Sequence, residues 1–244
     1  MSDLQAIVVF TDGAAKGNPG PGAWGVIIVT PAGEVTEHGA RAAQTTTNNR
    51  MELTGAIEAL SALRGLPGAL AIYTDSTYVI QGIRGWIFGW RKRGWKTAAG
   101  ADVLNRDLWE RLDALVSARG KGGVAWHYVR GHAGIPGNER VDAIADGLAQ
   151  GLPITLYRGP LLGYPYAILD LPSETDVPAR SSSGGGPRAK GAPFSYLSVV
   201  DGQLARHATW ADCERRVKGR AGARFKKAMS AAEETAILRA WQME

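Results

Sequence analysis

Four acidic residues sit at the ends of separate motifs: Asp12 in FTDGAAKGNPGPGAWG, Glu52 in TTTNNRMEL, Asp75 in IYTDSTYV and Asp142 in GHAGIPGNERVDAIAD. Two of them close short apolar runs of strand length, and the other two fall on the first turns of predicted helices. Carboxylates gathered in one pocket repel one another unless cations lie between them, and hard oxygen ligands favour Mg²⁺ or Mn²⁺ over zinc. The pattern therefore indicates metal-dependent chemistry on phosphate.

Each carboxylate also has an ordinary structural interpretation. Asp12 forms a common turn pair with the glycine after it, and Asp75 could cap the helix that follows. Glu52 has the spacing of a capping box with Asn49, and Asp142 could be a solvated residue on the polar side of a helix. The order of elements favours the functional interpretation of the set, because alternating strands and helices bring the ends of adjacent parallel strands to one edge of a sheet, where ligands bind.

The elements that must position these residues follow from the hydrophobic pattern. Five segments have the length and apolar content of strands: 6–10, 23–30, 34–41, 70–74 and 124–129. Four segments show helical spacing or helix boundaries: 53–63, a stretch from near Ser76, 106–118 and 137–150. A hairpin followed by alternating strands and helices predicts an α/β fold with a mixed sheet and helices on its faces.

Composition narrows the class of protein. The chain has 244 residues, of which 45% are hydrophobic and 21% charged, as in an ordinary soluble protein with one core and a small second unit. A formal net charge of +5 favours a polyanionic partner. The single cysteine, Cys213, excludes an intrachain disulfide and a cysteine-based zinc site. No apolar run approaches the roughly 18 residues of a membrane span, so we expect a cytoplasmic monomer without membrane contact.

The composition changes after Gly151. Residues 151–172 contain proline and tyrosine without periodicity, and SSSGGGPRAKGAP has the make-up of a flexible linker. The proline and tyrosine content leaves open a second possibility, packing of 151–172 against the first domain. The predicted organisation is a first domain over 1–150, a linker over 151–192 that is first Pro/Tyr-containing and then Ser/Gly-rich, and a small α+β domain over 193–244.

The motifs carry a family resemblance. The series TDGAAKGNPGPGAWG, TTNNRMEL, YTDSTYV, GWIFGWRKRGWKTA, NRDLW and VRGHAGIPGNERVDAIAD resembles bacterial ribonuclease HI, in order and at family spacing, over about residues 5–150. The resemblance implies a five-stranded mixed sheet and an endoribonuclease that cuts the RNA strand of RNA/DNA hybrids, leaving 5′-phosphate and 3′-hydroxyl ends. It also implies that two Mg²⁺ ions, with Mn²⁺ as an alternative, are held by Asp12, Glu52, Asp75 and Asp142.

One histidine belongs to the same set. His132 lies between glycines in Arg130–Gly134, and a lone histidine in such a loop is most often simply exposed. The resemblance favours a role as a proton carrier or as an aid to product departure, and imidazole is the side chain that exchanges protons near neutral pH.

The resemblance further implies residues that contact the hybrid. Positions matching minor-groove contacts are Asn18, Asn48, Asn49 and Gln81. For Asn18 the alternative is turn formation before Pro19. Thr47 and Asn105 match a pocket that holds a DNA phosphate, although an arginine often found two residues before this threonine is Thr45 here.

A basic segment lies between the motifs of Asp75 and Asp142. Residues 84–96, RGWIFGWRKRGWK, contain five cations and no acid, a local charge of +5. The segment resembles the basic handle of the bacterial enzymes, which holds the DNA strand through its phosphates. The implied contact residues are Trp86, Arg91, Lys92, Arg93 and Lys96. The tryptophans alternatively pack within a small protrusion, since Trp86 and Trp90 share one helical face.

The C-terminal domain is also basic. Eight lysines or arginines and two acids lie between Arg206 and Lys227. The pattern FSYLSVVDG, ATWADCERRVKG and AGARFKKA resembles the hybrid-binding, or viroplasmin-like, domain of eukaryotic ribonucleases H1, although its first turn lacks the basic residues often seen there. The implied hybrid contacts are Trp210, Phe225, Lys226 and Lys227. The alternative is a basic module that docks on protein.

Two other functions remain open from the sequence. Another nuclease of the same fold, such as a resolvase, would differ in its substrate, since fold alone does not fix it. A nucleic-acid binding protein with a decayed site is disfavoured because all four carboxylates and His132 are present.

Overall fold

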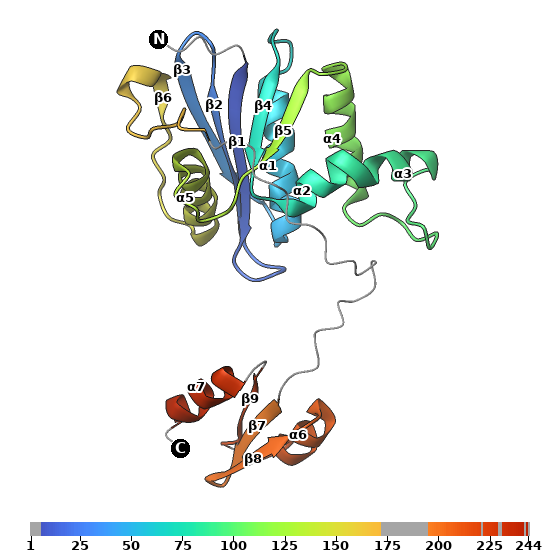
Figure 1. Ribbon diagram of the computed structural model, residues 1–244, viewed down its shortest axis with the longest axis vertical. Helices are drawn as coiled ribbons and strands as arrows, with labels where there is room; N and C mark the ends of the chain where they lie inside the picture. Colours follow the sequence, from blue (N-terminus) through green and yellow to red (C-terminus); the bar gives the residue numbers. More distant parts are fainter. Residues whose placement is uncertain (1–5, 172–194, 221, 229–230, 242, 244) are drawn as a thin grey trace. The chain divides into compact units, whose positions relative to one another are not determined.

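The computed structural model describes residues 6–171, 195–220, 222–228, 231–241 and 243. The chain divides by its internal contacts into two compact units, Met1–Ala179 and Arg180–Glu244 (Figure 1). Within the described ranges, no helix has both the length and the apolar character needed to cross a membrane.

A six-stranded mixed sheet forms the centre of the first unit (Figure 1). Its strands, in spatial order, are β5 (Val124–Tyr128), β4 (Leu70–Thr74), β1 (Ile7–Ala15), β2 (Gly22–Val29), β3 (Glu34–Arg41) and β6 (Arg158–Pro160). The strands β1, β4 and β5 run parallel, whereas β2, β3 and β6 pair antiparallel. The prediction of five strands is wrong by one: β6 adds to the outer edge of β3, and a three-residue strand is too short to produce an apolar alternation in the sequence.

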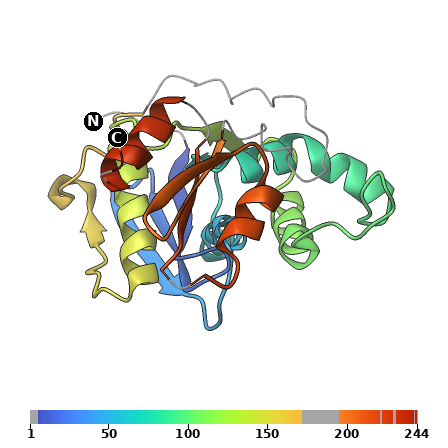
Figure 2. The ribbon, with the colours of Figure 1, turned by 90° about the horizontal axis from the view of Figure 1, so that it is seen from below.

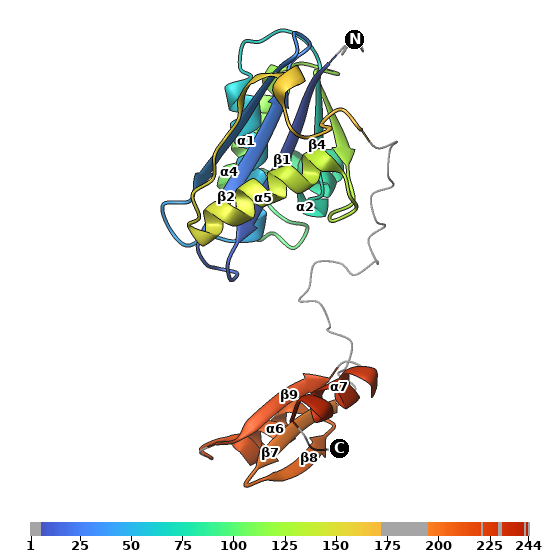
Figure 3. The same ribbon diagram turned by 90° about the vertical axis from the view of Figure 1, so that its left-hand side faces the viewer.

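Helices cover both faces of this sheet, as predicted. α1 (Asn48–Ala62) and α4 (Arg106–Ala118) lie on one face and α5 (Pro136–Gln150) on the other (Figures 1 and 3). Adjacent strand residues alternate between the faces. Val9 is buried with the α1 side of the core, and Phe10, its neighbour in β1, with the α5 side.

The basic segment continues from a helix rather than a loop. α2 (Thr77–Gln81) leads through a π-helical turn, η1 (Gly82–Trp86), into α3 (Ile87–Lys92). A Cβ atom on Gly82 would lie 2.0 Å from Cη2 of Trp109, so the glycine allows the indole ring to pack against this turn. Trp109 is fully buried and its ring centroid lies 5.4 Å from that of Trp90. The tryptophans of the segment therefore pack on one another, as the structural alternative expects, and Trp90 also packs on Trp109 of α4.

Residues 152–171, which we call the strap, pack against the α5 face of the sheet. Tyr164 and Ile168 are buried in the same cluster as Val141 and Ile144 of α5. The side chain of Glu37 in β3 is fully buried and anchors the strap. Its carboxylate accepts hydrogen bonds from the Tyr164 hydroxyl at 2.7 Å and from the Tyr157 backbone N–H at 2.9 Å. Of the two possibilities for 151–172, packing is the one observed for the strap.

The same carboxylate binds α5. Arg140 donates to the two oxygens of Glu37 at 2.7 Å each, and its Nη2 also donates to the Thr155 carbonyl at 3.0 Å. One buried acid thus joins β3, α5 and the strap.

The second unit is a small α+β domain, as predicted. Its antiparallel sheet has the order β8 (Gln203–His207), β7 (Ser195–Val200) and β9 (Arg224–Ala228). The sheet is flanked by α6 (Trp210–Val217) and α7 (Ala231–Trp241) (Figure 2). A small core forms around Leu197, Ala228, Ile237 and Leu238.

Candidate active site

The first two carboxylates lie on β1 and directly after β4, which are neighbouring strands. β1 continues to Ala15 rather than ending near Asp12 as predicted, because its pairing with β2 runs through the whole strand. Its parallel pairing with β4, however, ends at Phe10 and Tyr73. Asp12 follows Phe10 by two residues, as Asp75 follows Tyr73. The two acids therefore come level with each other just beyond the parallel pairing, at the edge where the sequence places them.

The other two carboxylates come from helices on opposite faces. Glu52 is the fifth residue of α1 and Asp142 the seventh of α5, so both lie in the second turn rather than the predicted first turn. Glycines let each helix approach the sheet here. A Cβ on Gly13 would lie 2.2 Å from the backbone nitrogen of Glu52, and one on Gly25 would lie 2.8 Å from the Val141 carbonyl oxygen.

The hydrogen bonds at the helix N-termini test whether these acids serve as caps. Thr47 caps α1 by accepting from the Arg50 N–H, and Ser76 caps α2 by accepting from the Val79 N–H at 3.1 Å. Neither Asp75 nor Glu52 serves as the cap of its helix. The hydrogen bond from the Gly13 N–H to Asp12 Oδ1, 2.7 Å long, matches the turn pair, but Asp12 is part of a strand and is 7% exposed.

The four acids influence one another electrostatically. Burial raises the pKa of Asp12 well above its ordinary value, and the charges of Asp75, Asp142 and Glu52 add to this effect. Burial also raises the pKa of Glu52 to about 7, against a hydrogen bond from the Ser76 hydroxyl at 2.5 Å. The pKa of Asp75 is raised by burial and by the charge of Asp142. The arrangement therefore disfavours the state in which all four carboxylates are ionised and no cation lies between them.

The donor set fits hard divalent cations. It consists of carboxylate oxygens, which Mg²⁺ and Mn²⁺ prefer, and a cation between them would relieve the repulsion that raises their pKa values. Among the residues that the structure describes, no three His, Cys, Asp or Glu side chains already converge as a metal-binding group. The charges of Asp75, Asp142 and Glu52 thus affect the pKa of Asp12, but no three of these side chains form a ready metal-binding group.

Asp75 has two further neighbours that sequence reasoning missed. Asn138 on α5 is 2% exposed and donates from Nδ2 to Asp75 Oδ2 at 3.2 Å. Its own Oδ1 is buried without a hydrogen-bond partner in the described part of the chain. A Cβ on Gly131 would lie 2.7 Å from Asp75 Oδ2. The available signal was a polar residue four positions before Asp142, on the side of α5 that faces the sheet.

His132 lies at the rim of the site. Its side chain is 86% exposed and its Nδ1 is 3.9 Å from Asp142 Oδ2. The residue has a φ of 53°, in the left-handed region, within the loop between β5 and α5. The backbone N–H of Gly134 donates to Glu139 Oε1 at 2.9 Å, which ties this loop to the first turn of α5.

Two of the predicted minor-groove residues meet beside the site. The Asn48 side chain accepts from the Ala15 N–H at 2.6 Å, and the Asn18 side chain accepts from the Asn48 N–H at 3.3 Å. These contacts tie the loop between β1 and β2 to the start of α1. Asn18 and Asn48 are exposed, whereas Asn49 and Gln81 are partly buried.

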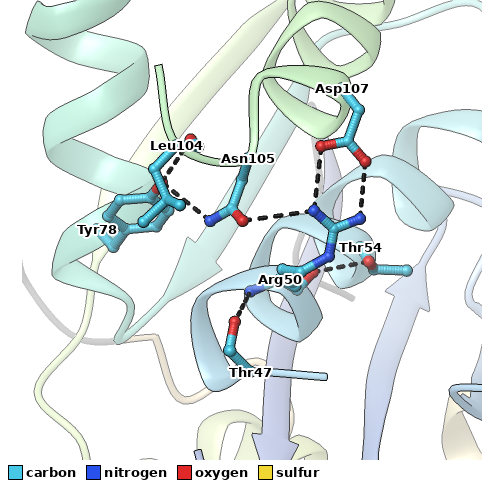
Figure 4. Close-up of polar contacts among 7 residues, drawn as sticks. All are labelled: Thr47, Arg50, Thr54, Tyr78, Leu104, Asn105 and Asp107. Atoms are coloured by element: carbon cyan, nitrogen blue, oxygen red, sulfur yellow. Dashed lines mark hydrogen bonds and ion pairs between the residues drawn. The ribbon is translucent and has the colours of Figure 1, made fainter. Parts of the chain in front are cut away.

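Thr47 and Asn105 come together around Arg50 (Figure 4). Thr47 accepts from the Arg50 backbone N–H at 3.4 Å, and Asn105 Oδ1 accepts from the Arg50 guanidinium at 3.4 Å. The same guanidinium donates to both oxygens of Asp107, at 3.0 and 2.7 Å. Asn105 in turn donates to the Tyr78 hydroxyl at 3.2 Å. Arg50 contacts both predicted phosphate-binding residues, Asn105 through its guanidinium and Thr47 through its backbone N–H, and it was not among them.

The basic segment is less positive than its sequence suggests. Arg91 forms two hydrogen bonds with Asp113 of α4, and it also donates to the Ser117 hydroxyl at 3.0 Å. Lys96 pairs with Asp102 at 2.7 Å. Acids from outside 84–96 thus balance two of its five cations. Lys92 and Arg93 are exposed, and Trp86 packs edge-on against Tyr78 with ring centroids 5.7 Å apart.

The predicted contact residues of the second unit lie on β9 and at the start of α6. Trp210 is 40% exposed and Phe225 is 52% exposed, with ring centroids 5.3 Å apart. Trp210 also packs against Tyr196 at 5.8 Å. Lys227 is two residues from Phe225 and shares its face of the strand, whereas Lys226 points to the opposite face. The four predicted residues therefore do not form a single surface.

Comparisons with known proteins concern the first unit. The model of the family described as RNase H matches residues 4–150. Ribonuclease H of Thermosynechococcus vestitus is 56% identical over 158 residues, which cover 64% of this chain and 95% of that relative. Ribonuclease H of Polaromonas naphthalenivorans is 52% identical over 146 residues, covering 60% of this chain and 88% of that relative.

A solved structure is similar over a comparable share of the chain. LC9-RNase H1, a type 1 RNase H with the type 2 active-site motif, is 32% identical with a TM-score of 0.54 and covers 64% of this chain and 78% of its own. The family match extends over more than half of the chain and contains all four carboxylates. The chain therefore belongs to the RNase H family.

Proposed function

We propose that the first unit is an endonuclease that hydrolyses the RNA strand of RNA/DNA hybrids and leaves 5′-phosphate and 3′-hydroxyl ends. The observation that carries the proposal is the electrostatic proximity of Asp12 in β1, Asp75 directly after β4, and Glu52 and Asp142 on two opposed helices. Family membership and the name Ribonuclease H of the relatives support the same activity. The catalytic domain of this proposal comprises residues 1–150.

The four carboxylates would hold two Mg²⁺ ions, or Mn²⁺ in their place. Such a pair would supply an activated water and charge stabilisation for the leaving 3′ oxygen. The chain itself has three tasks: its carboxylates hold the cations, Asn138 orients Asp75, and His132 carries a proton at the rim or helps the product to leave. No nucleophilic side chain is required.

Substrate binding falls to residues around this edge. Asn18 and Asn48, tied to each other, would read the minor groove together with Asn49 and Gln81. Thr47 and Asn105 would hold a phosphate of the DNA strand beside Arg50. The exposed cations Lys92 and Arg93 would contribute the handle contacts more directly than Arg91 and Lys96, whose charges are already paired.

A strand-labelled cleavage assay tests the activity. RNA/DNA, RNA/RNA and DNA/DNA duplexes are incubated with the protein, with and without Mg²⁺, and only the RNA strand of the hybrid should be cut, with Mg²⁺ present. Cutting of DNA/DNA would indicate another nuclease of this fold, and no cutting a binding protein. Asp75→Asn should abolish cleavage and retain hybrid binding, while Asp170→Asn, an exposed residue of the strap, should cleave normally. Substantial cleavage by Asp75→Asn in Mg²⁺ would contradict the metal-site assignment.

His132 is tested separately. His132→Ala should lower kcat by about 10²-fold, the lower end of what a positioned proton carrier contributes. A pre-steady-state burst in this variant would assign the slow step to product departure. Full turnover would return His132 to the ordinary interpretation of an exposed loop residue.

For the second unit we propose hybrid binding by the domain over 193–244, joined through the linker predicted over 151–192. The specific observation in its favour is the pair of exposed aromatic rings, Trp210 and Phe225, with Lys227 on the same face. Stacking on aromatic side chains and phosphate contacts are the usual components of such binding. A tethered second contact raises the effective concentration of substrate at the nuclease unit.

A truncated variant tests the hybrid-binding role of the second unit, and the strap determines at which residue the variant should end. Removal of everything after residue 150 would also remove Tyr164 from Glu37, so the informative variant ends at Ala179, the boundary of the first unit. This variant should show a raised KM on long hybrids with kcat unchanged. Unchanged KM would argue for the alternative, a module that docks on protein. The cytoplasmic, monomeric state stays a prediction from the sequence.

A further inference from the structure

A basic pocket lies beside the first turn of the second unit, away from the aromatic rings. Its volume is about 400 Å³ and it is lined by Val200, Asp201, Gln203, Arg215, Arg216 and Arg220. Three arginines thus face one carboxylate, that of Asp201. We call this site the arginine pocket.

The arginines are partly fixed before any ligand binds. Arg216 is half-buried and its Nη2 donates to the Gln203 carbonyl at 3.1 Å. Its Nε is buried and has no hydrogen-bond partner in the described part of the chain. Arg215 is held by Asp212 at 2.8 Å, one turn earlier on α6. A guanidinium that is already oriented loses less side-chain freedom when it binds an anion.

Arginine pockets of this kind favour oxyanions. The planar guanidinium presents paired N–H donors that match the oxygens of a phosphate. The turn over Asp201 and Gly202 carries no basic residue of its own. The cations come instead from the end of α6 and the residues after it, which the fold brings to the turn. The charge at this end of the unit is therefore not visible in the sequence of the turn.

The aromatic rings indicate which phosphate the pocket takes. Trp210 begins α6 and Arg216 lies six residues later, about 9 Å along the helix axis at 1.5 Å per residue. A duplex carries one charge per roughly 1.7 Å of its axis, so a nucleic acid that stacks on Trp210 and continues toward the end of α6 presents several phosphates over that length. An acidic protein segment would satisfy the arginines but would give no role to the exposed rings of the same unit.

We propose that the arginine pocket binds a backbone phosphate of the nucleic acid whose other contact is the Trp210 and Phe225 surface. The second unit then holds its substrate at two places on one duplex. The proposal rests on the hybrid-binding role given to this unit under Proposed function, and it adds a site that none of the predicted contact residues occupies.

Salt-dependent binding of the full chain tests the pocket. Affinity for a fluorescent RNA/DNA hybrid is measured by anisotropy over a KCl series in the non-cleaving Asp75→Asn background. Arg220→Gln, at an exposed position, should reduce the slope of log K against log salt by about 1, the contribution of one phosphate contact. Arg239→Gln on α7 removes the same charge from an exposed position outside the pocket and should leave the slope within error of the parent.

A variant that is expected to bind the hybrid more tightly gives an independent test of the arginine pocket. Asp201→Asn removes the only carboxylate among the described residues that line the pocket and should tighten binding several-fold at low salt. Asp201 has a φ of 52°, which asparagine tolerates, so the fold should be preserved, as thermal unfolding can verify. Unchanged affinity in Asp201→Asn together with equal slopes in Arg220→Gln and Arg239→Gln would overturn the proposal.

A variant of the aromatic surface distinguishes failure of the hybrid-binding role from failure of the arginine-pocket proposal. Trp210→Ala should weaken binding through loss of stacking. If Trp210→Ala and Arg220→Gln both bind as the parent does, the hybrid-binding role of the second unit is wrong. If Trp210→Ala weakens binding and Arg220→Gln does not, that role stands and the arginine pocket is overturned.

Discussion

Asn138 donates a hydrogen bond to Asp75 across 3.2 Å and links α5 to the end of β4. The amide is almost completely buried, and the glycine at 131 leaves room for the carboxylate on its other side. The contact joins the helix that carries Asp142 to the acid that follows β4. A metal-binding carboxylate oriented in this way should depend on its partner even though the partner is no ligand.

Asn138→Ala should therefore weaken metal binding. We expect a loss of about 10-fold to 100-fold in Mn²⁺ affinity, the usual effect of removing a group that orients a metal ligand. Calorimetric titration of Mn²⁺ measures this without turnover, and thermal unfolding reports any change in stability. A variant that is less stable but binds Mn²⁺ as the parent does would limit Asn138 to a structural role.

Glu37→Gln should destabilise the first unit. The side chain of Glu37 is fully buried and that of Arg140 is 15% exposed, so the substitution leaves a buried guanidinium without its counter-charge. The expected loss is about 3 kcal/mol in the free energy of unfolding, measured by chemical denaturation. Glu34→Gln, an exposed acid of the same strand, is the control and should change stability by less than about 0.5 kcal/mol. Equal effects of the two substitutions would contradict the buried-anchor interpretation.

The same acid predicts a pH dependence. Burial alone would raise the pKa of Glu37, but hydrogen bonds from Arg140, Tyr164 and the Tyr157 N–H outweigh burial and hold it below its ordinary value of 4.5. A lowered pKa in the folded state gives stability that is complete above 4.5 and is lost as pH falls through the folded-state value. The stability difference between the parent and Glu37→Gln should therefore be constant from pH 7 to about 5 and shrink in more acidic buffers. A stability difference that increased as the pH fell would contradict a lowered pKa of Glu37 in the folded state.

Gly82 and Gly85 make a matched pair in the π-helical turn. A methyl group at position 82 would meet the Trp109 ring, whereas nothing lies within 4 Å of one at position 85. Gly82→Ala should cost about 1 to 3 kcal/mol through overpacking. Gly85→Ala should stabilise by up to about 1 kcal/mol, because alanine favours the helix. Denaturant unfolding curves compare the two, and similar midpoints would show that the ring shifts freely.

Paired and unpaired cations of the basic segment should differ in binding. Lys92→Ala should lower the salt slope of hybrid binding by about 1, as expected for a phosphate contact. Arg91→Ala should lower it less, because Asp113 already neutralises that guanidinium. Anisotropy over a salt series in the Asp75→Asn background gives both slopes. A larger effect from Arg91→Ala would mean that nucleic acid displaces Asp113.

The local hydrophobic pattern of the sequence was sufficient to predict most helices and strands of the first unit. The continuous apolar run that predicted β1 and the apolar stripe of α1 are buried as expected, because the apolar pattern is a property of the segment itself. The same pattern could not find β6, whose three residues form a strand only because the edge of β3 is there to pair with. It also ended β1 too early, since pairing with β2 continues past the last apolar residue.

The sequence by itself determined the residue types of the site: four carboxylates and a histidine in motifs typical of one family. Only the tertiary structure decided which neighbours act on them. Asn138 reaches Asp75, the Arg50 guanidinium reaches Asn105, and Asp113 takes the charge of Arg91. These pairs are between 22 and 63 residues apart in the chain. A charge or a hydrogen bond depends on distance in space, and distance in space between remote residues is set by packing rather than by sequence spacing.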